Sequence, residues 1–477
     1  MNFQPYQRLP LRIYSCNQLT SSSSLLYFES TRGYSEKMIP LVFKRMDYTD
    51  PDVQIGYKKI YVAFLRFSGM YPNLTGRWYY FFGVFGMYLH VFYFGYIIDY
   101  CVSVALAIEY SDTYVLVYNL CFGSLTVIYY VVLHYGMYQK FLLDEILKIV
   151  GQGFFTYERP PTPHEQKIGL STDVACRRTF LRQMSVIVLT MFGSLILLPL
   201  SYGIRGEYSS MGEDKIPINK HLSLPMWLPY NTDTPLKFWL TLLGMFNDGS
   251  AEGRIIASSC IIYCNLCTCL ASQFDLLSHS LRDLEARAIY AYERKGYAAL
   301  PSKDAYYDDP RFHVIMNECL DENIRHYQVL LVFNSKLQKY VGPAVFAILS
   351  GMALTISCPS FLLLQLTKSE EAISAMAIVR IVNLGIIIGS FMTYLYFYCS
   401  YGQLVTSASE KLHFALYESP WMRANTSFKR KLIITMNRSE QPLRIDVLGL
   451  VKADSATFLD ALKTMFSYCN LLAAVQN

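Results

Sequence analysis

The feature that most constrains this chain is a series of apolar stretches, each long enough to cross a lipid bilayer. A transmembrane helix needs about 20 consecutive, mainly apolar residues. The chain contains seven candidates, at about 78–108, 113–135, 180–200, 236–274, 341–366, 372–399 and 456–475. Charged residues make up only 17% of the sequence, too few to cover a soluble protein of 477 residues. The apolar runs are continuous and do not alternate, so they predict an all-α membrane protein and not a membrane β-barrel.

The fourth stretch is the least regular of the seven. It is interrupted by the polar segment Asp248-Gly-Ser-Ala-Glu-Gly-Arg254. Either a long helix starts near Leu236 and carries these charges, or a minimal helix starts at Ile255. We favour the longer helix, because apolar residues continue at helical spacing beyond the membrane.

Two acids of that segment, Asp248 and Glu252, share one helix face if the longer helix forms. Ionisable groups at membrane depth usually face the protein interior and pair with one another. Arg380, in the sixth stretch, is then a candidate partner for them. The alternative is that both acids lie in a hydrated outer loop, and the sequence does not decide between the two.

The distribution of Lys and Arg predicts the orientation in the membrane. The alternating polar segments 1–77, 139–179, 275–340 and 402–455 hold 33 basic residues. The other set, 109–112, 203–235 and 367–371, holds only 4. The first set is therefore expected to be cytoplasmic, with the N-terminus inside and, after seven spans, the C-terminus outside. This orientation is opposite to that of G-protein-coupled receptors.

These segments divide the chain into four expected regions. Residues 1–77 form a cytoplasmic N-terminal region with an amphipathic helix, and 78–401 contain spans one to six with cytoplasmic helical extensions. Residues 402–455 form a cytoplasmic anchor segment, and 456–477 form the seventh span. Within the second region, 285–322 are expected to form a charged loop before span five.

No catalytic, metal or nucleotide-binding pattern stands out in the sequence. The run Cys264-x-x-Cys267-x-Cys269 has spacing that resembles a zinc site, but it lies in an apolar stretch without a fourth ligand in register. Packing is the better interpretation of these cysteines. We therefore expect neither an enzyme nor a cofactor, and no nucleic-acid partner.

Short motifs spread over most of the chain resemble the insect odorant receptor family. They are Leu65-Arg-Phe-Ser-Gly-Met-Tyr-Pro72, Leu228-Pro-Tyr-Asn-Thr-Asp-Thr-Pro-Leu236, Gln273-Phe-Asp-Leu-Leu277, His326-Tyr-Gln-Val-Leu330, Tyr398-Cys-Ser-Tyr-Gly-Gln403, Ser409-Glu-Lys-Leu412, Ala415-Leu-Tyr-Glu-Ser-Pro-Trp421 and Ser467-Tyr468. The last residues, 469–477, lack the bulky Val- and Leu-rich ending of the obligate coreceptor. The chain is thus similar to an odour-tuning subunit.

The resemblance implies a seven-helix channel subunit with a helical cytoplasmic anchor domain. Such a subunit binds a small volatile odorant and forms a heterotetrameric, non-selective cation channel with the coreceptor. Its expected place is the plasma membrane of an olfactory neuron dendrite, in contact with the lipid bilayer. A gustatory-type receptor channel is the nearest alternative, although this chain has Ser467-Tyr468 where that family has Thr-Tyr. A solute carrier would predict internal repeats, which we do not find.

The same resemblance suggests which residues bind the ligand and which close the pore. The family's odorant pocket lies in the outer half of the bundle, between spans two, three, four and six. Mapping by depth gives Tyr118, Phe122, Gly193, Leu197, Met245, Asn383 and Ile387. Leu471 and Val475 share a face of span seven, where the family has an apolar ring that gates by dewetting.

Overall fold

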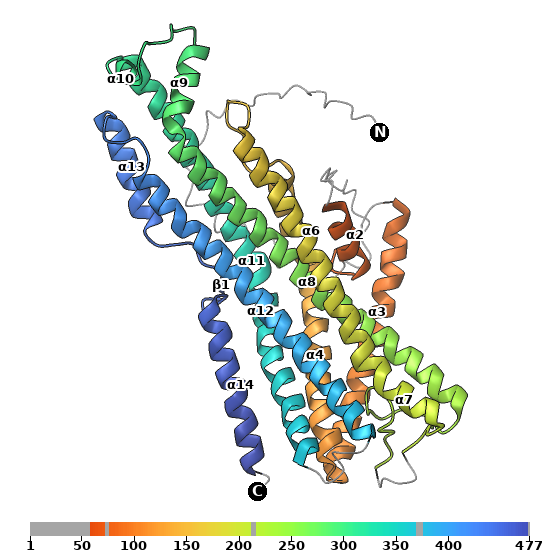
Figure 1. Ribbon diagram of the computed structural model, residues 1–477. Helices are drawn as coiled ribbons and strands as arrows, with labels where there is room; N and C mark the ends of the chain where they lie inside the picture. The colour runs from red at the N-terminus through yellow and green to blue at the C-terminus, as the bar shows by residue number, and fades with distance from the viewer. Residues whose placement is uncertain (1–57, 72–75, 211–215, 369–374, 476–477) are drawn as a thin grey trace, which may run out of the picture.

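The computed structural model describes residues 58–71, 76–210, 216–368 and 375–475. Within these ranges the chain is almost entirely helical (Figure 1). Six of the described helices are long and apolar enough to cross a membrane. They lie where the first six apolar stretches predict them, because long apolar runs satisfy their backbone groups internally only as helices. The chain is therefore a mainly helical, multi-pass membrane protein.

The helices fall into a long set and a short set. The long set comprises α3 (Gly76–Glu109), α4 (Thr113–Tyr138), α6 (Pro163–Met191) with its continuation through the π-helix η1 (Phe192–Leu197) and α7 (Leu198–Arg205), α8 (Pro235–Arg282), α11 (Pro310–Lys368) and α12 (Ala375–Tyr417). The short set comprises α2 (Lys58–Phe67), α5 (Lys140–Gly151), α9 (Leu284–Arg294), α10 (Lys303–Tyr307), α13 (Thr426–Ser439) and α14 (Ser455–Val475). A two-stranded hairpin of β1 (Asp446–Val447) and β2 (Val451–Lys452) precedes α14.

Helix α8 occupies the centre of the bundle and packs against α2, α4, α6, α11 and α12. In its most apolar stretch 94% of the residues are buried, against 22% for α3 at the periphery. The helix runs without a break from Pro235 to Arg282, through the polar segment 248–254. The prediction of the longer fourth span is thereby confirmed.

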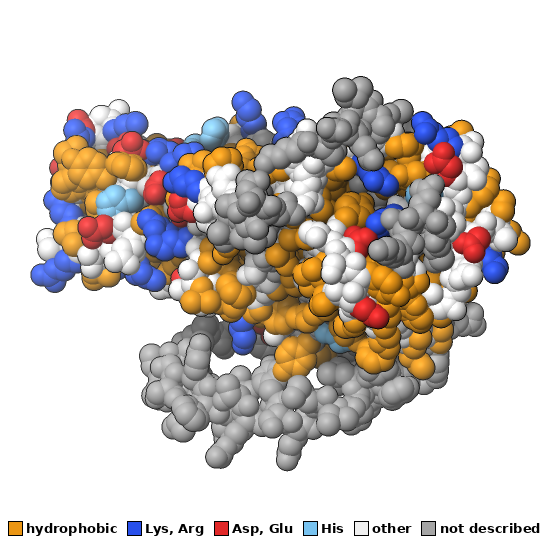
Figure 2. All heavy atoms as spheres, turned by 90° about the horizontal axis from the view of Figure 1, so that it is seen from below, with side chains coloured by type: hydrophobic (Ala, Val, Ile, Leu, Met, Phe, Trp, Pro, Cys, Tyr) orange, Lys and Arg blue, Asp and Glu red, His pale blue; other side chains and the backbone are white. Residues whose placement is uncertain are grey.

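The outer faces of the bundle are apolar where a bilayer would surround them. On α3, the side chains of Val84, Val91 and Phe94 are 70%, 75% and 63% exposed. In the end-on view of Figure 2, hydrophobic side chains cover much of the visible bundle. Exposed apolar surface on this scale is typical of lipid contact and would be costly in water.

Helices α8, α11 and α12 continue beyond the bundle toward the end that carries α9, α10 and α13 (Figure 1). The prediction of a charged loop over 285–322 is wrong, since this segment contains α9, α10 and the first turns of α11. Leu284, Ala288 and Tyr292 recur every fourth residue and are buried, so one face of α9 packs against α11. Burial of this apolar face stabilises α9 as a helix although its other faces are polar.

A buried arginine ties these extensions together. The Arg287 guanidinium pairs with Glu322 on α11 and lies 4.3 Å from the ring centre of Tyr157. Burial raises the pKa of the Tyr157 phenol to about 12. Both contacts link segments far apart in sequence, and they make this end of the molecule a packed helical unit.

The loop between α7 and α8 folds back into the bundle instead of extending from it. Ser223 accepts a hydrogen bond through its carbonyl from the Tyr118 hydroxyl at 3.0 Å. Asn119 donates to the Pro225 carbonyl at 2.7 Å. The intervening Leu224 is buried with Tyr118 and Met245 in one apolar cluster. The loop thus closes one end of the space between the helices.

Helix α14 stands beside the bundle and contacts α11 and α12 (Figure 1). Its bounds agree with the predicted helix at 456–475. The side chains of Leu471 and Val475 lie outside the described part of the structure, so the gate stays a prediction. The crossing of the membrane by this helix, the orientation, the anchor role of 402–455 and the four-region division also stay predictions.

Candidate ligand-binding cavity

A cavity of about 70 Å³ lies inside the bundle, among α4, α6 with η1, α8 and α12. The loop residue Leu224 closes it on one side. These helices contain predicted spans two, three, four and six. The volume is several times that needed for one water molecule. The cavity can therefore accept a compact organic group.

Two glycines one turn apart on α8, Gly249 and Gly253, allow α6 and η1 to approach closely and form one wall. A Cβ atom at Gly249 would overlap the Leu195 side chain, and one at Gly253 would lie 2.9 Å from Cε of Met191. Small residues at this spacing favour close helix packing in membranes. The cavity lies beside this contact, because all four residues line it.

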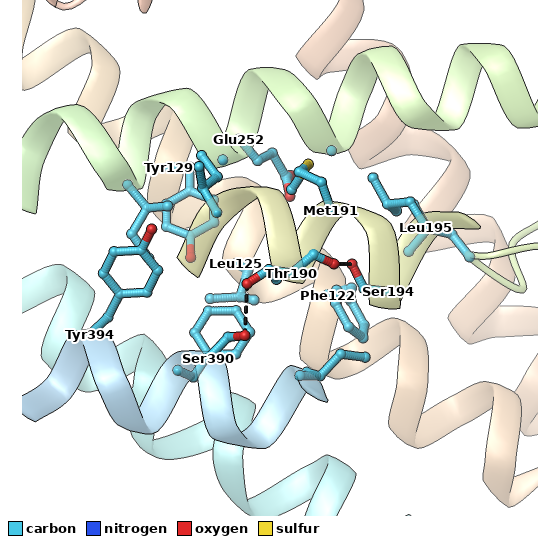
Figure 3. A pocket seen from close by; sticks show the side chains of 17 residues that line it. Phe122, Leu125, Tyr129, Thr190, Met191, Ser194, Leu195, Glu252, Ser390 and Tyr394 are labelled. Carbon is cyan, nitrogen blue, oxygen red and sulfur yellow. Dashed lines mark hydrogen bonds between the residues drawn. The ribbon is translucent and has the colours of Figure 1, made fainter. Parts of the chain in front are cut away.

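Hydroxyl groups connect α6 and α12 across the cavity (Figure 3). The Thr190 hydroxyl donates to Oγ of Ser390 at 2.7 Å. Ser194, on η1, donates to the Thr190 carbonyl at 2.6 Å. Near η1, the Asn383 amide donates to the Gly193 carbonyl at 2.6 Å. All of these bonds satisfy polar groups in an apolar environment, and those of Ser390 and Asn383 hold α12 in register with α6 and η1.

The remaining lining is largely apolar and aromatic, as expected for a small-ligand site. Phe122 and Tyr129 come from α4, and Phe391 and Tyr394 from α12. Tyr118 stacks on Phe122 from outside the cavity, with ring centres 4.5 Å apart. Such walls recognise a ligand mainly by shape and dispersion, which act on many apolar molecules.

One acid, Glu252 of α8, faces this apolar cavity (Figure 3). Its Oε1 accepts a hydrogen bond from the Thr126 hydroxyl at 2.5 Å. Asp248 lies one turn earlier on α8 and is only 1% exposed. Neither carboxylate oxygen of Asp248 has a hydrogen-bond partner among the described residues.

Both acids lie on a bundle helix and face its interior, as the first explanation expected, but its pairing with Arg380 and the alternative of a hydrated outer loop are wrong. Asp248 and Glu252 lie inside helix α8 and not in a hydrated loop. Arg380 donates instead to the Tyr202 hydroxyl at 2.6 Å. Arg254, on the same helix, donates to the Ser250 hydroxyl at 3.0 Å. Within the described ranges, no cation lies at ion-pair distance from either acid.

The predicted binding residues are distributed unevenly around the cavity. Phe122 and Ile387 line it. The other five, which do not, are Tyr118, Gly193, Leu197, Met245 and Asn383. Tyr118 and Met245 instead belong to the apolar cluster under the loop. Gly193 gives α12 room, since a Cβ there would lie 2.6 Å from Cγ2 of Ile386. A ligand-binding role for the seven residues stays a prediction.

Sequence reasoning missed Thr190 and Ser390 in the lining, and it singled out Glu252 only as a partner in an ion pair and not as a lining residue. A signal for Glu252 was present, because an acid beside a Gly-x-x-x-Gly pattern marks a close and polar helix contact. The two hydroxyl residues carry no comparable signal, since serine and threonine are common in membrane helices.

The family model and the curated relatives that match this chain all point to the same family. The family model described as "7tm Odorant receptor" matches residues 113–466, well over half of the chain. Among curated proteins, Odorant receptor 85b of Drosophila melanogaster is 24% identical over 259 residues, 54% of this chain and 57% of the relative. Odorant receptor 33a of the same species is 32% identical over 73 residues, 15% of this chain and 19% of the relative. The matches thus span less than two thirds of these relatives.

Solved structures support the fold. The olfactory receptor OR5 from Machilis hrabei, in complex with eugenol, superposes with a TM-score of 0.65 at 12% sequence identity. The match covers 88% of this chain and 98% of that one. A second structure of OR5 from Machilis hrabei gives a TM-score of 0.66 at 12% identity with the same coverage.

Proposed function

Because this chain belongs to the insect odorant receptor family, we propose that it is the odour-binding subunit of a ligand-gated, non-selective cation channel. Its partners in this proposal are a small volatile odorant and a coreceptor, with which it forms a heterotetramer. Its location is the plasma membrane of an olfactory neuron dendrite. The excess of basic residues in 1–77, 139–179, 275–340 and 402–455 supports a cytoplasmic N-terminus.

The observation that carries the proposal is the mainly apolar cavity between α4, α6, α8 and α12. A volatile odorant is a small, mainly apolar molecule, and a cavity with aromatic walls removes its surface from water. Entry of the odorant favours whichever bundle arrangement binds it better. The ligand needs no large contact area, because only the difference in affinity between closed and open states shifts the equilibrium.

A physical route from the cavity to the proposed pore runs through α12. Tyr394 of this helix lines the cavity. Two residues further on, Tyr396 packs against Phe458 of α14, with ring centres 5.8 Å apart. Six residues further along α12, Gly402 touches the backbone just before α14, where a Cβ atom would overlap the Ala453 carbonyl. A shift of α12 therefore moves α14, on which Leu471 and Val475 form the proposed apolar gate.

Whole-cell recording tests this function. Cells that express the chain with an insect coreceptor should give odorant-evoked cation currents, whereas cells with either subunit omitted should give a different odorant profile or none. Saturable uptake of an odorant without conductance would contradict the proposal and favour a carrier. Substitution of Leu471 or Val475 by serine should raise the current in the absence of odorant, because a polar ring is easier to hydrate.

A further inference from the structure

The cavity contains a chemical feature that apolar recognition does not explain, namely the carboxyl group of Glu252. We propose that the preferred ligands of this receptor carry a basic amine on a small apolar body, and that Glu252 binds the amine. The inference rests on the proposed function and specifies the ligand class of the same cavity.

The first argument is the missing counterion. Burying a carboxylate in an apolar medium is costly unless a cation or hydrogen-bond donors accompany it. Glu252 has one such donor, the Thr126 hydroxyl at 2.5 Å. Arg254, which is near in sequence, donates its hydrogen bond to Ser250. Arg380, which was the predicted partner, donates to Tyr202. A ligand ammonium group would supply the absent charge directly.

The second argument is the pair of acids. Asp248 lies one helical turn from Glu252 on the same face of α8, is 1% exposed, and has both oxygens without hydrogen-bond partners in the described part of the chain. Like charges repel, so two neighbouring buried carboxyl groups hold a proton between them, and the charge that remains attracts a cation and repels an anion. Carboxylic acids are therefore expected to be poor ligands for the same site.

The third argument is the aromatic lining around the acid. The rings of Phe122, Tyr129 and Tyr394 surround the cavity (Figure 3). Aromatic faces attract cations and also pack against apolar groups. The Tyr394 hydroxyl is buried and has no hydrogen-bond partner within the described ranges, so it can accept a bond from an ammonium hydrogen. Acid, hydroxyl and rings together form a site for an amine.

The size of the cavity limits the ligand. A volume of about 70 Å³ corresponds to roughly five water-sized groups. Short, branched alkylamines therefore fit better than long-chain or multi-ring amines. Isoamylamine, isoamyl alcohol and 2-methylpentane form a matched set, since they share one carbon frame and differ only in the terminal amine, hydroxyl or methyl group.

The test compares such matched amine, alcohol and alkane sets on the receptor expressed with a coreceptor. We expect amines to be the most potent class on the unmodified chain. In Glu252→Gln, which keeps the shape and an acceptor for Thr126, the half-maximal concentration for amines should rise by about 10- to 100-fold. The half-maximal concentration for alcohols should change by less than about threefold in the same variant. Asp99→Asn is the matched control, because Asp99 is an acid of α3 that does not line the cavity.

Several outcomes separate this inference from the proposed function. Alcohols or alkanes that act more potently than amines, or equal loss of amine and alcohol responses in Glu252→Gln, would overturn the amine assignment and leave the channel proposal intact. Thermal unfolding of the purified receptor provides a readout that needs no current. Amines should raise its unfolding temperature, and Glu252→Gln should abolish that rise. Stabilisation by amines without any evoked current would refute the channel while supporting the amine site.

Discussion

The contact between Tyr396 of α12 and Phe458 of α14 gives the sharpest prediction about gating. The two rings meet edge to face, with centres 5.8 Å apart and planes at 74°. Aromatic pairs of this geometry contribute about 0.5–1.5 kcal/mol beyond the burial of their surface. If α14 moves relative to α12 when the channel opens, this energy is present in only one of the two states. Losing it then changes the closed-to-open ratio by about two- to twelvefold.

The assay is a double-mutant cycle on odorant-evoked current. Tyr396→Ala and Phe458→Ala should each shift the half-maximal odorant concentration in the same direction, and the double variant should shift it no further than the larger single effect. The coupling free energy is expected at about 0.5–1.5 kcal/mol. Phe414→Ala is the control, since Phe414 also lies on α12 and is similarly exposed, but its ring contact in the described structure is with the adjacent His413 and not with α14. Strictly additive shifts, or an unchanged half-maximal concentration in both single variants, would refute the proposed route.

Three further predictions concern packing. Gly402→Ala should lower the maximal current at normal surface expression, because its methyl group would push the Ala453 carbonyl, and hence α14, away from α12. Asn383→Leu should reduce thermal stability by about 1–3 kcal/mol, since the buried Gly193 carbonyl loses its 2.6 Å hydrogen bond; an unchanged unfolding temperature would argue against this bond. Arg287→Met should destabilise the fold by about 3–5 kcal/mol, measured as lost surface expression, because the paired carboxylate stays partly buried without its cation.

The sequence predicted the membrane helices well because their signal is long and continuous. It failed over 285–322, where charged residues are frequent and the buried face of α9 recurs only at every fourth position. The period of Leu284, Ala288 and Tyr292 was visible, but a charged composition was given more weight than this period. Short amphipathic helices are stabilised by tertiary packing, which a local sequence window does not contain.

For the cavity, the sequence predicted the lining helices but not the level along each helix at which the lining residues lie. The four helices that line it match the expectation, but the lining residues lie about one to two helical turns, or about 5–11 Å, further from the α7–α8 loop than expected. On α4 the lining leaves out Tyr118 and extends to Tyr129, and on α12 it leaves out Asn383 and extends to Tyr394. The loop causes this shift, because Leu224 fills the end of the bundle and displaces the open space. A residue's position along its helix does not show that a loop residue such as Leu224 fills the end of the bundle.

The account depends on the cavity being the place where odorant binding opens the channel, and filling the cavity tests this most directly. Ile387 lines it and is 1% exposed, whereas Val382 on the same helix is 45% exposed. The measurement is the odorant-evoked current of Ile387→Trp, with Val382→Trp as control, both expressed with the coreceptor at verified surface levels. We predict that Ile387→Trp loses its odorant response while a ligand acting through the coreceptor still opens the channel, and that Val382→Trp responds normally. An unchanged odorant response in Ile387→Trp would contradict the account.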